Sequence, residues 1–249
     1  MTYSLVSPAV QERIGLDNRG ALALENPLSS EYSLLRSTLL IGALQTVARN
    51  LRRKSADVLR LFEVGYRYGA AAGSQKQEEP AQARTLSLVV AGVPTSRWGS
   101  SPRVFGVLDL KGAVLCLFER LGFLLEDLEE RMEASPVHPY LSKPSLLWQS
   151  SGRRVGFAAE IEPRVLAAYD LPEDCPLAYA ELDLEGIATL SRLGQKIRPL
   201  PKVPPVLRDL AIVVAEEVSH REVAQAIQAA GRPLLQEAAL FDLYLGKQV

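Results

Sequence analysis

The residues best suited to chemistry are arginines and one glutamate between positions 36 and 67 of this 249-residue chain. Arg36 lies in a polar and aliphatic stretch, and Glu63 lies between Arg60 and Arg67 on an apolar, aromatic stretch. A guanidinium can bind a phosphate, and a carboxylate can serve as a general acid or base. Such groups more often bind each other or backbone carbonyls. We therefore interpret Arg36 as structural, and Glu63 as the partner of Arg60 and Arg67 in a cross-strand ion pair.

A second group of basic residues closes a predicted helix, and its members are Arg49, Arg52, Arg53 and Lys54. They could contact RNA phosphates. Basic residues in a last turn also suit the helix dipole, so we favour a solvated helix end. Trp98 could stack on a base. We favour its packing on the core or on a partner subunit.

Histidines and cysteines are too sparse for a metal centre. His138 precedes a proline in a turn, His220 begins a predicted helix, and neither has Cys or Asp at ligand spacing. Cys116 and Cys175 are interpreted as reduced thiols of a cytoplasmic protein. We therefore predict no catalytic, cofactor-binding or metal-binding residue in this chain.

The composition is that of an ordinary globular protein, with 47% hydrophobic and 23% charged residues. The formal net charge of −1 supplies no overall field that would attract nucleic acid. The first residues lack the pattern of a signal peptide, and no apolar run approaches the roughly 20 residues that span a bilayer. We therefore expect no membrane association.

Hydrophobic spacing predicts the elements that position these residues. Leu40, Leu44, Val47 and Leu51 form a helical stripe that Ser37 or Thr38 could cap. A second stripe comprises Leu110, Val114, Leu117 and Leu121, and Gly122 closes it. Shorter helices are predicted at 8–14, 163–169 and 219–231, and strands at 2–6, 58–68, 84–92, 146–149, 154–160, 178–184, 210–214 and 239–245.

A proline-rich stretch from Gly194 to Val206 contains four prolines and predicts a linker. We place the boundary between two domains there, at 1–195 and 196–249. The second is predicted to be a β-α-β unit.

Several motifs in consistent order resemble the C-terminal part of the β subunit of bacterial phenylalanyl-tRNA synthetase. They include "NPLSSEYSLLRSTLL", "LRLFEVGYRY", "VLDLKGAVLCLFERLGF", "GRRVGFAAEIEPRVLAAYDLPEDCPLAYAELDL" and "PKVPPVLRDLAIVV". The resemblance covers nearly the whole chain. The residues that we take as its structural signature are Asn26, Pro27, Leu28, Ser29, Glu31, Leu35, Arg36, Leu61, Phe62, Glu63 and Gly65.

The resemblance implies an α+β fold with a class II aminoacyl-tRNA synthetase-like antiparallel sheet and flanking helices. A truncated ferredoxin-like unit, the first half of an anticodon-binding domain, would follow. The family's enzyme is an (αβ)2 heterotetramer that joins phenylalanine to tRNA(Phe) using ATP and Mg²⁺, with catalysis in the α subunit. Lys202 and Arg208 become candidate RNA contacts. A half-domain would expose strand edges, so self-association is expected.

The sequence agrees with a non-catalytic role, because it lacks the two arginines that bind phosphate in a class II site. A class II site needs one arginine on its motif 2 strand and another after a glycine-rich strand, because fixed guanidinium groups stabilise the charge of the reacting phosphate. Gly69 falls at the first position, and Arg67 lies on the same face about 7 Å away. Arg120 follows no glycine run. We therefore expect this chain alone to be inactive. The alternatives are a free-standing interaction or regulatory protein on the same fold, and an enzyme with an unrecognised site.

Overall fold

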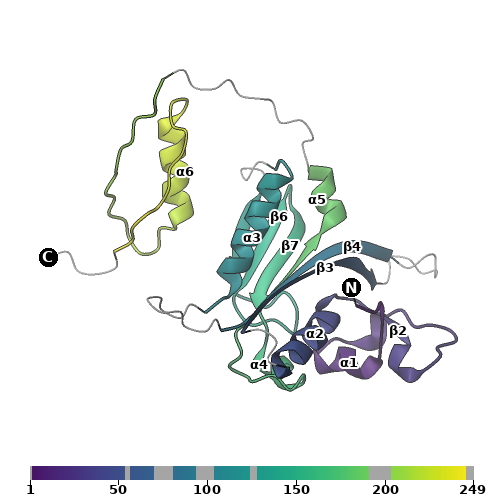
Figure 1. The fold of residues 1–249 in the computed structure, drawn as a ribbon. Coiled ribbons are helices and arrows are strands. Elements are labelled where there is room, and N and C mark those ends of the chain that lie inside the picture. The colour runs from purple at the N-terminus through teal and green to yellow at the C-terminus, as the bar shows by residue number, and fades with distance from the viewer. Residues whose placement is uncertain are drawn as a thin grey trace. The chain divides into compact units, whose positions relative to one another are not determined.

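The computed structural model describes residues 2–53, 57–69, 81–93, 104–123, 128–190 and 203–244. It divides into two compact units, Met1–Lys196 and Ile197–Val249 (Figure 1).

A six-stranded antiparallel sheet organises the first unit. Its strands are β3 (Val58–Gly69), β4 (Ala81–Gly92), β5 (Glu129–Glu133), β6 (Ser145–Ser150), β7 (Arg153–Glu160) and β8 (Leu177–Asp183). They are hydrogen-bonded in the order β3-β4-β8-β7-β6-β5, so β3 and β5 are the edges. A separate two-stranded ladder joins β1 (Leu5–Val6) to β2 (Leu34–Leu35).

Helices cover both faces of this sheet, because each central strand is apolar on both sides. The helices are α1 (Pro8–Arg13), α2 (Leu40–Arg52), α3 (Val107–Arg120), α4 (Pro163–Ala167) and α5 (Leu184–Leu190), with short 3₁₀ turns at Asn18–Gly20 and Ser30–Tyr32. α2 and α3 lie on opposite sides of the sheet (Figure 1).

Two hydrophobic cores result from this arrangement. Val89 and Tyr179 belong to the core under α2, whereas their neighbours Val90 and Ala180 belong to the core under α3. This alternation follows from the strand period of two residues. Along α3 the buried stripe is Leu110, Val114 and Phe118, so the predicted contribution of Leu121, which is exposed, is wrong.

Most predicted elements of this unit are confirmed. The stripe that begins at Leu40 is α2, and Ser151 and Gly152 form the tight turn between β6 and β7, both with positive φ. The predicted first strand is wrong over residues 2–4, because β1 contains only Leu5 and Val6. The N-cap of α2 is Leu39, although the Thr38 hydroxyl accepts a hydrogen bond from the Leu40 amide at 3.1 Å.

The second unit contains α6 (His220–Gly231), which begins with a capping box formed by Ser219 and Glu222. The predicted strand at 210–214 is not formed, and residues 239–244 of the second predicted strand are not in a strand either. In a ferredoxin-like fold the two strands that flank a helix are not neighbours, because another strand lies between them. Residues 203–244 contain no third segment that pairs with them, so no ladder forms.

Candidate functional site

The face of the sheet under α2 changes from apolar to polar at the point where α2 begins. Two rows of the register mark this change: Glu63, Ser87 and Glu181 lie in one row, and Gly65, Thr85 and Asp183 lie in the next. Together with Arg67, which shares their face of β3, these residues form what we call the polar half-face. An active site on a synthetase-like sheet is expected in such a region, so its charges decide what it can bind.

Arg36 is buried at the edge of the polar half-face, with 2% of its surface exposed. Its Nε donates to the Tyr66 carbonyl at 2.9 Å. Its Nη1 donates to Thr2 Oγ1 at 2.8 Å and to Glu63 Oε1 at 3.1 Å. An added Cβ at Gly65 would lie 2.3 Å from Arg36 Nη2, so the missing side chain at Gly65 makes room for the guanidinium. Arg36 is therefore engaged inside the protein and is not open to a ligand.

Glu63 completes this buried network. The Thr2 amide donates to Glu63 Oε1 at 3.0 Å, and the Thr2 hydroxyl donates to Oε2 at 2.8 Å. Burial raises the pKa of Glu63, but the hydrogen bonds from Thr2 and the charge of Arg36 outweigh it and hold the pKa below its ordinary value. The carboxylate is thus ionised, which suits neither a general acid nor a binding site for phosphate.

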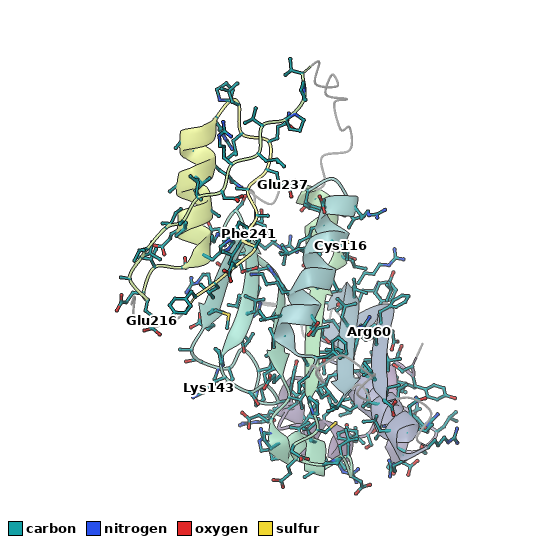
Figure 2. All side chains as sticks on the ribbon, turned by 60° about the vertical axis from the view of Figure 1, so that its left-hand side comes forward. Arg60, Cys116, Lys143, Glu216, Glu237 and Phe241 are labelled. Carbon is teal, nitrogen blue, oxygen red and sulfur yellow. The ribbon has the colours of Figure 1, made fainter. Side chains whose placement is uncertain are left out.

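The predicted pairing of Glu63 with Arg60 and Arg67 is wrong. Arg60 (labelled in Figure 2) is an odd number of residues away and points to the opposite face, where its guanidinium lies 4.6 Å from the centre of the Phe105 ring. Arg67 shares the face of Glu63, but it is four residues along the strand, or about 13 Å away. The true partner, Arg36, comes from a segment that the strand pattern does not include.

The Glu181 carboxylate occupies the N-terminus of α2, much as the Glu63 carboxylate occupies Arg36. Its Oε1 accepts hydrogen bonds from Thr38 Oγ1 at 2.6 Å, from the Leu39 amide at 2.8 Å and from the Tyr179 hydroxyl at 2.5 Å. Burial and the nearby Glu181 charge raise the pKa of Tyr179 well above its ordinary value, so the phenol remains a donor. The helix N-terminus would otherwise attract an anionic ligand. Here a carboxylate of the chain itself occupies it.

Asp183, in the second register row, neutralises the positive charge of Arg153. Its Oδ2 accepts from Arg153 Nη2 at 2.8 Å, and its Oδ1 accepts from the Glu185 and Gly186 amides at 3.1 and 3.0 Å. The step from β8 to α5 lies beside β4, but it supplies no arginine as a second phosphate anchor, because the residue after Glu185 is a glycine. Arg120 cannot substitute for it, because α3 packs on the other face.

Besides Arg153, the exposed residues Arg67 and Arg154 bring positive charge to this region. Both lower the pKa of His138, although burial is the larger cause and Glu181 opposes it. His138 stacks on Tyr140 with ring centres 5.0 Å apart, so it belongs to the aromatic core. Gly69 ends β3, and an added Cβ there would contact nothing within 4 Å. Among the described residues, nothing fills the space at this position and no guanidinium lies there.

The remaining predicted residues are spread over other surfaces. Exposed signature residues are Asn26, Pro27, Leu28, Ser29 and Glu31, and Phe62 is exposed on the far face of β3. Leu35 and Leu61 are half-buried. Arg208 is exposed, whereas Lys202, Lys54 and Trp98 lie outside the described residues. The structure brings together only Arg36, Glu63 and Gly65 from the signature set.

Spacing alone did not identify three of the residues that shape the site, namely Glu181, Asp183 and Arg153. The available signal was the run "ELD" at the end of a predicted apolar strand, which places two carboxylates on one face.

The polar half-face does not fit the triphosphate of ATP. Arg36 is paired with Glu63, the α2 N-terminus with Glu181, and Arg153 with Asp183. A phosphate would have to displace three carboxylates that are already hydrogen-bonded. Within the described ranges, no group of three or more His, Cys, Asp or Glu side chains could hold a metal ion. No helix among them is long and apolar enough to cross a membrane.

Comparisons with known proteins agree with this reading of the fold. A family model of the phenylalanyl-tRNA synthetase β-chain CLM domain matches residues 1–184, and one of the ferredoxin-fold anticodon-binding domain matches residues 201–249. The phenylalanine–tRNA ligase β subunit of Ralstonia nicotianae is 37% identical over 240 residues, which cover 92% of this chain and 28% of that protein. The Moorella thermoacetica subunit is 34% identical over 254 residues, covering 100% of this chain and 30% of its own length.

The chain thus spans about 30% of the length of these relatives. Among solved structures, a pyrrolysyl-tRNA synthetase from Desulfitobacterium hafniense has a TM-score of 0.51 at 17% identity, over 76% of this chain and 58% of that one. At this identity the likeness concerns the fold, which is that of a class II synthetase-like α+β module. Because the first family model covers most of the chain, the chain belongs to the phenylalanyl-tRNA synthetase β-chain family.

Proposed function

We propose that the chain is a non-catalytic part of a phenylalanyl-tRNA synthetase. Residues 1–195 would form a class II-like module that packs against the catalytic α subunit, and residues 196–249 would contribute to an anticodon-binding domain. The complete enzyme would be a cytoplasmic (αβ)2 assembly that attaches phenylalanine to tRNA(Phe). ATP and Mg²⁺ would bind in the α subunit, because the polar half-face does not fit them.

One observation supports the non-catalytic role above all others. Three anion-binding elements of the polar half-face already hold a carboxylate of the chain: Glu63 on Arg36, Glu181 on α2 and Asp183 on α5. Adenylation needs preorganised positive groups that remain free for the substrate phosphate. A face in which these three positive groups are internally neutralised can keep the fold while lacking the reaction.

The free-standing interaction protein is the weaker alternative, because both family models match in order along the chain. It differs from the first proposal in one measurable way. Only a β-subunit module is expected to elute together with the synthetase α subunit of the same organism in size-exclusion chromatography.

The catalytic part of the proposal is tested by phenylalanine-dependent ATP–pyrophosphate exchange with the purified 249-residue chain. We expect no exchange above that of a blank preparation. The variants Arg67→Ala and Arg154→Ala separate the chain's own activity from a contaminating synthetase, because each removes an exposed arginine whose charge reaches the region of the polar half-face. Exchange by the wild-type chain that either substitution abolishes would contradict the proposal.

A further inference from the structure

A basic groove lies on the α2 side of the first unit, away from the polar half-face. It has a volume of about 550 Å³ and lies between α1, the last turns of α2 and the residues that follow α4. These helices are neighbours at the foot of Figure 1. Its charged and aromatic lining consists of Arg13, Arg49, Arg52, Arg53, Asp170, Tyr3, Tyr32 and Tyr169.

Among the described residues, the positive charge that lines this groove exceeds the negative charge that pairs with it. Among its lining residues, four arginines face one carboxylate, Asp170, which binds Arg52 at 3.2 Å. Arg13, Arg49 and Arg53 are exposed and form no ion pair with any described residue. The polar half-face pairs Arg36 and Arg153 with carboxylates, whereas this groove keeps three guanidinium groups available. Guanidinium groups at such spacing bind phosphate oxygens well.

Tyr169 adds a buried donor to the groove. Only 7% of its surface is exposed, and its hydroxyl has no hydrogen-bond partner among the described residues. A buried hydroxyl without a partner is unfavourable unless a ligand completes it. Burial raises the pKa of Tyr169 to about 12, against the opposing charge of Arg13, so the phenol is protonated and can donate to an anion.

Two further tyrosines stand at the rim. Tyr3 is 79% and Tyr32 is 44% exposed, and their rings meet edge to face with centres 5.9 Å apart. Exposed aromatic rings beside a basic groove provide stacking surfaces for unpaired bases. Guanidinium groups, a protonated phenol and flat apolar rings together match a nucleic acid strand better than they match an isolated phosphate.

We propose that this groove binds the phosphate backbone of single-stranded RNA. Arg13, Arg49 and Arg53 contact phosphate oxygens, the Tyr169 hydroxyl donates to one of them, and a base stacks on Tyr3 or Tyr32. The site goes beyond the proposed function, since it lies in the class II-like unit and outside the region that the anticodon-binding model matches. It does not depend on an adenylation role.

The test measures fluorescence anisotropy of a labelled 12-nucleotide single-stranded RNA of mixed sequence with the full chain, as a function of salt. The double variant Arg49→Ala, Arg53→Ala removes two groove charges. The matched control Arg120→Ala, Arg131→Ala also removes two positive charges, from exposed residues outside the groove. The Tyr169→Phe variant removes only a hydroxyl without a partner.

We expect the groove double variant to bind the RNA at least tenfold more weakly. The slope of log K against log salt concentration should fall in magnitude by about 1.4, because two phosphate contacts are lost. The control is expected to keep both the affinity and this slope within twofold of wild type. Tyr169→Phe is expected to weaken binding roughly tenfold, the loss of one charge-assisted hydrogen bond. Thermal unfolding of each variant verifies that the fold is retained.

Three outcomes overturn the proposal: equal RNA affinity of the groove and control variants, unchanged affinity of Tyr169→Phe, or saturable binding of inorganic pyrophosphate with no binding of RNA. The last outcome would identify the groove as a site for small phosphate compounds. None of them bears on pyrophosphate exchange, so failure here is distinguishable from failure of the proposed function.

Discussion

Arg36 and Glu63 place opposite charges inside the first unit, where each depends on the other. The side chains are 3% and 10% exposed, so water compensates neither charge well. Removing one partner of a buried pair leaves the other charge unpaired, which is strongly destabilising, whereas replacing both with apolar groups can be nearly neutral. The pair therefore makes folding sensitive to the ionisation of a single carboxyl group.

The substitution Glu63→Gln keeps the size of the side chain and removes its charge. At pH 7 we expect it to lower the free energy of unfolding by about 2–3 kcal/mol, because Arg36 loses a charge-assisted hydrogen bond. The pKa of Glu63 is lowered on folding, so its ionisation stabilises the protein above the ordinary value of 4.5, and this contribution is lost as the pH falls through the folded-state pKa. The difference between the two proteins should therefore shrink below about pH 4.5.

Urea unfolding at several pH values measures this difference. Glu119→Gln, which changes an exposed carboxylate on α3, serves as the control and is expected to lie within about 0.5 kcal/mol of wild type. A stability gap between Glu63→Gln and wild type that stays constant from pH 7 to pH 3 would show that the charge of Glu63 contributes nothing.

Strand β3 contains two glycines whose surroundings differ. Gly65 faces Arg36, and a Cβ there would lie 2.3 Å from its Nη2, whereas a Cβ at Gly69 would meet no atom within 4 Å. Both positions are in one strand with ordinary extended backbone. They therefore form a matched pair in which only the surroundings of the added methyl group change.

We expect Gly65→Ala to destabilise the first unit by about 2–3 kcal/mol, because the methyl group forces Arg36 away from Glu63 in a packed region. Gly69→Ala should be neutral or slightly stabilising, by up to about 1 kcal/mol, since the substitution restricts the unfolded chain at no steric cost. Urea denaturation of the two variants compares them directly. Equal effects of the two substitutions would indicate that Arg36 moves aside freely.

Elements with a strong local pattern were predictable from the sequence. The stripe of Leu40, Leu44 and Val47 depends only on spacing, and these residues are buried in α2. The turn between β6 and β7 carries its own signal, because Gly152 accepts a positive φ. Spacing also predicted α3 but misassigned its last buried residue, because the helix ends at Arg120 and Leu121, its C-cap residue, is exposed.

The partners within the candidate site were not predictable in the same way. Which side chain meets Glu63 depends on the path of the segment from Thr2 to Arg36, and hydrophobic period contains no information about that path. Glu181 comes to lie beside Leu39 only because β8 is inserted between β4 and β7. Only the family resemblance gave information about long-range placement of this kind. It indicated that the phosphate anchors are absent, but it did not indicate which carboxylates lie around their positions.

At the scale of the whole molecule, the two units differ in how much apolar surface they bury. Within the described ranges, the buried core residues all lie between Val6 and Ile187, in the first unit. In the second unit, α6 buries none of its residues, and Leu207, Val213 and Phe241 are exposed by 84%, 78% and 78%. Since burial of apolar surface dominates folding stability, the main unfolding transition of the chain should belong to the first unit.

Exposed apolar side chains at this density favour association with another surface. We propose that the second unit causes self-association of the 249-residue chain, and expect that a variant ending at Lys196 is monomeric where the full chain is not. Its melting temperature should stay within about 3 °C of the full chain, since the cores are intact. Sedimentation velocity over a hundredfold range of concentration measures the association, and calorimetry measures the melting temperature.

Phe241→Ser in the full chain, which removes one exposed ring without shortening the chain, should reduce association partially. A full chain that stays monomeric throughout, or a shortened chain that associates equally, would rule out the second unit as the cause.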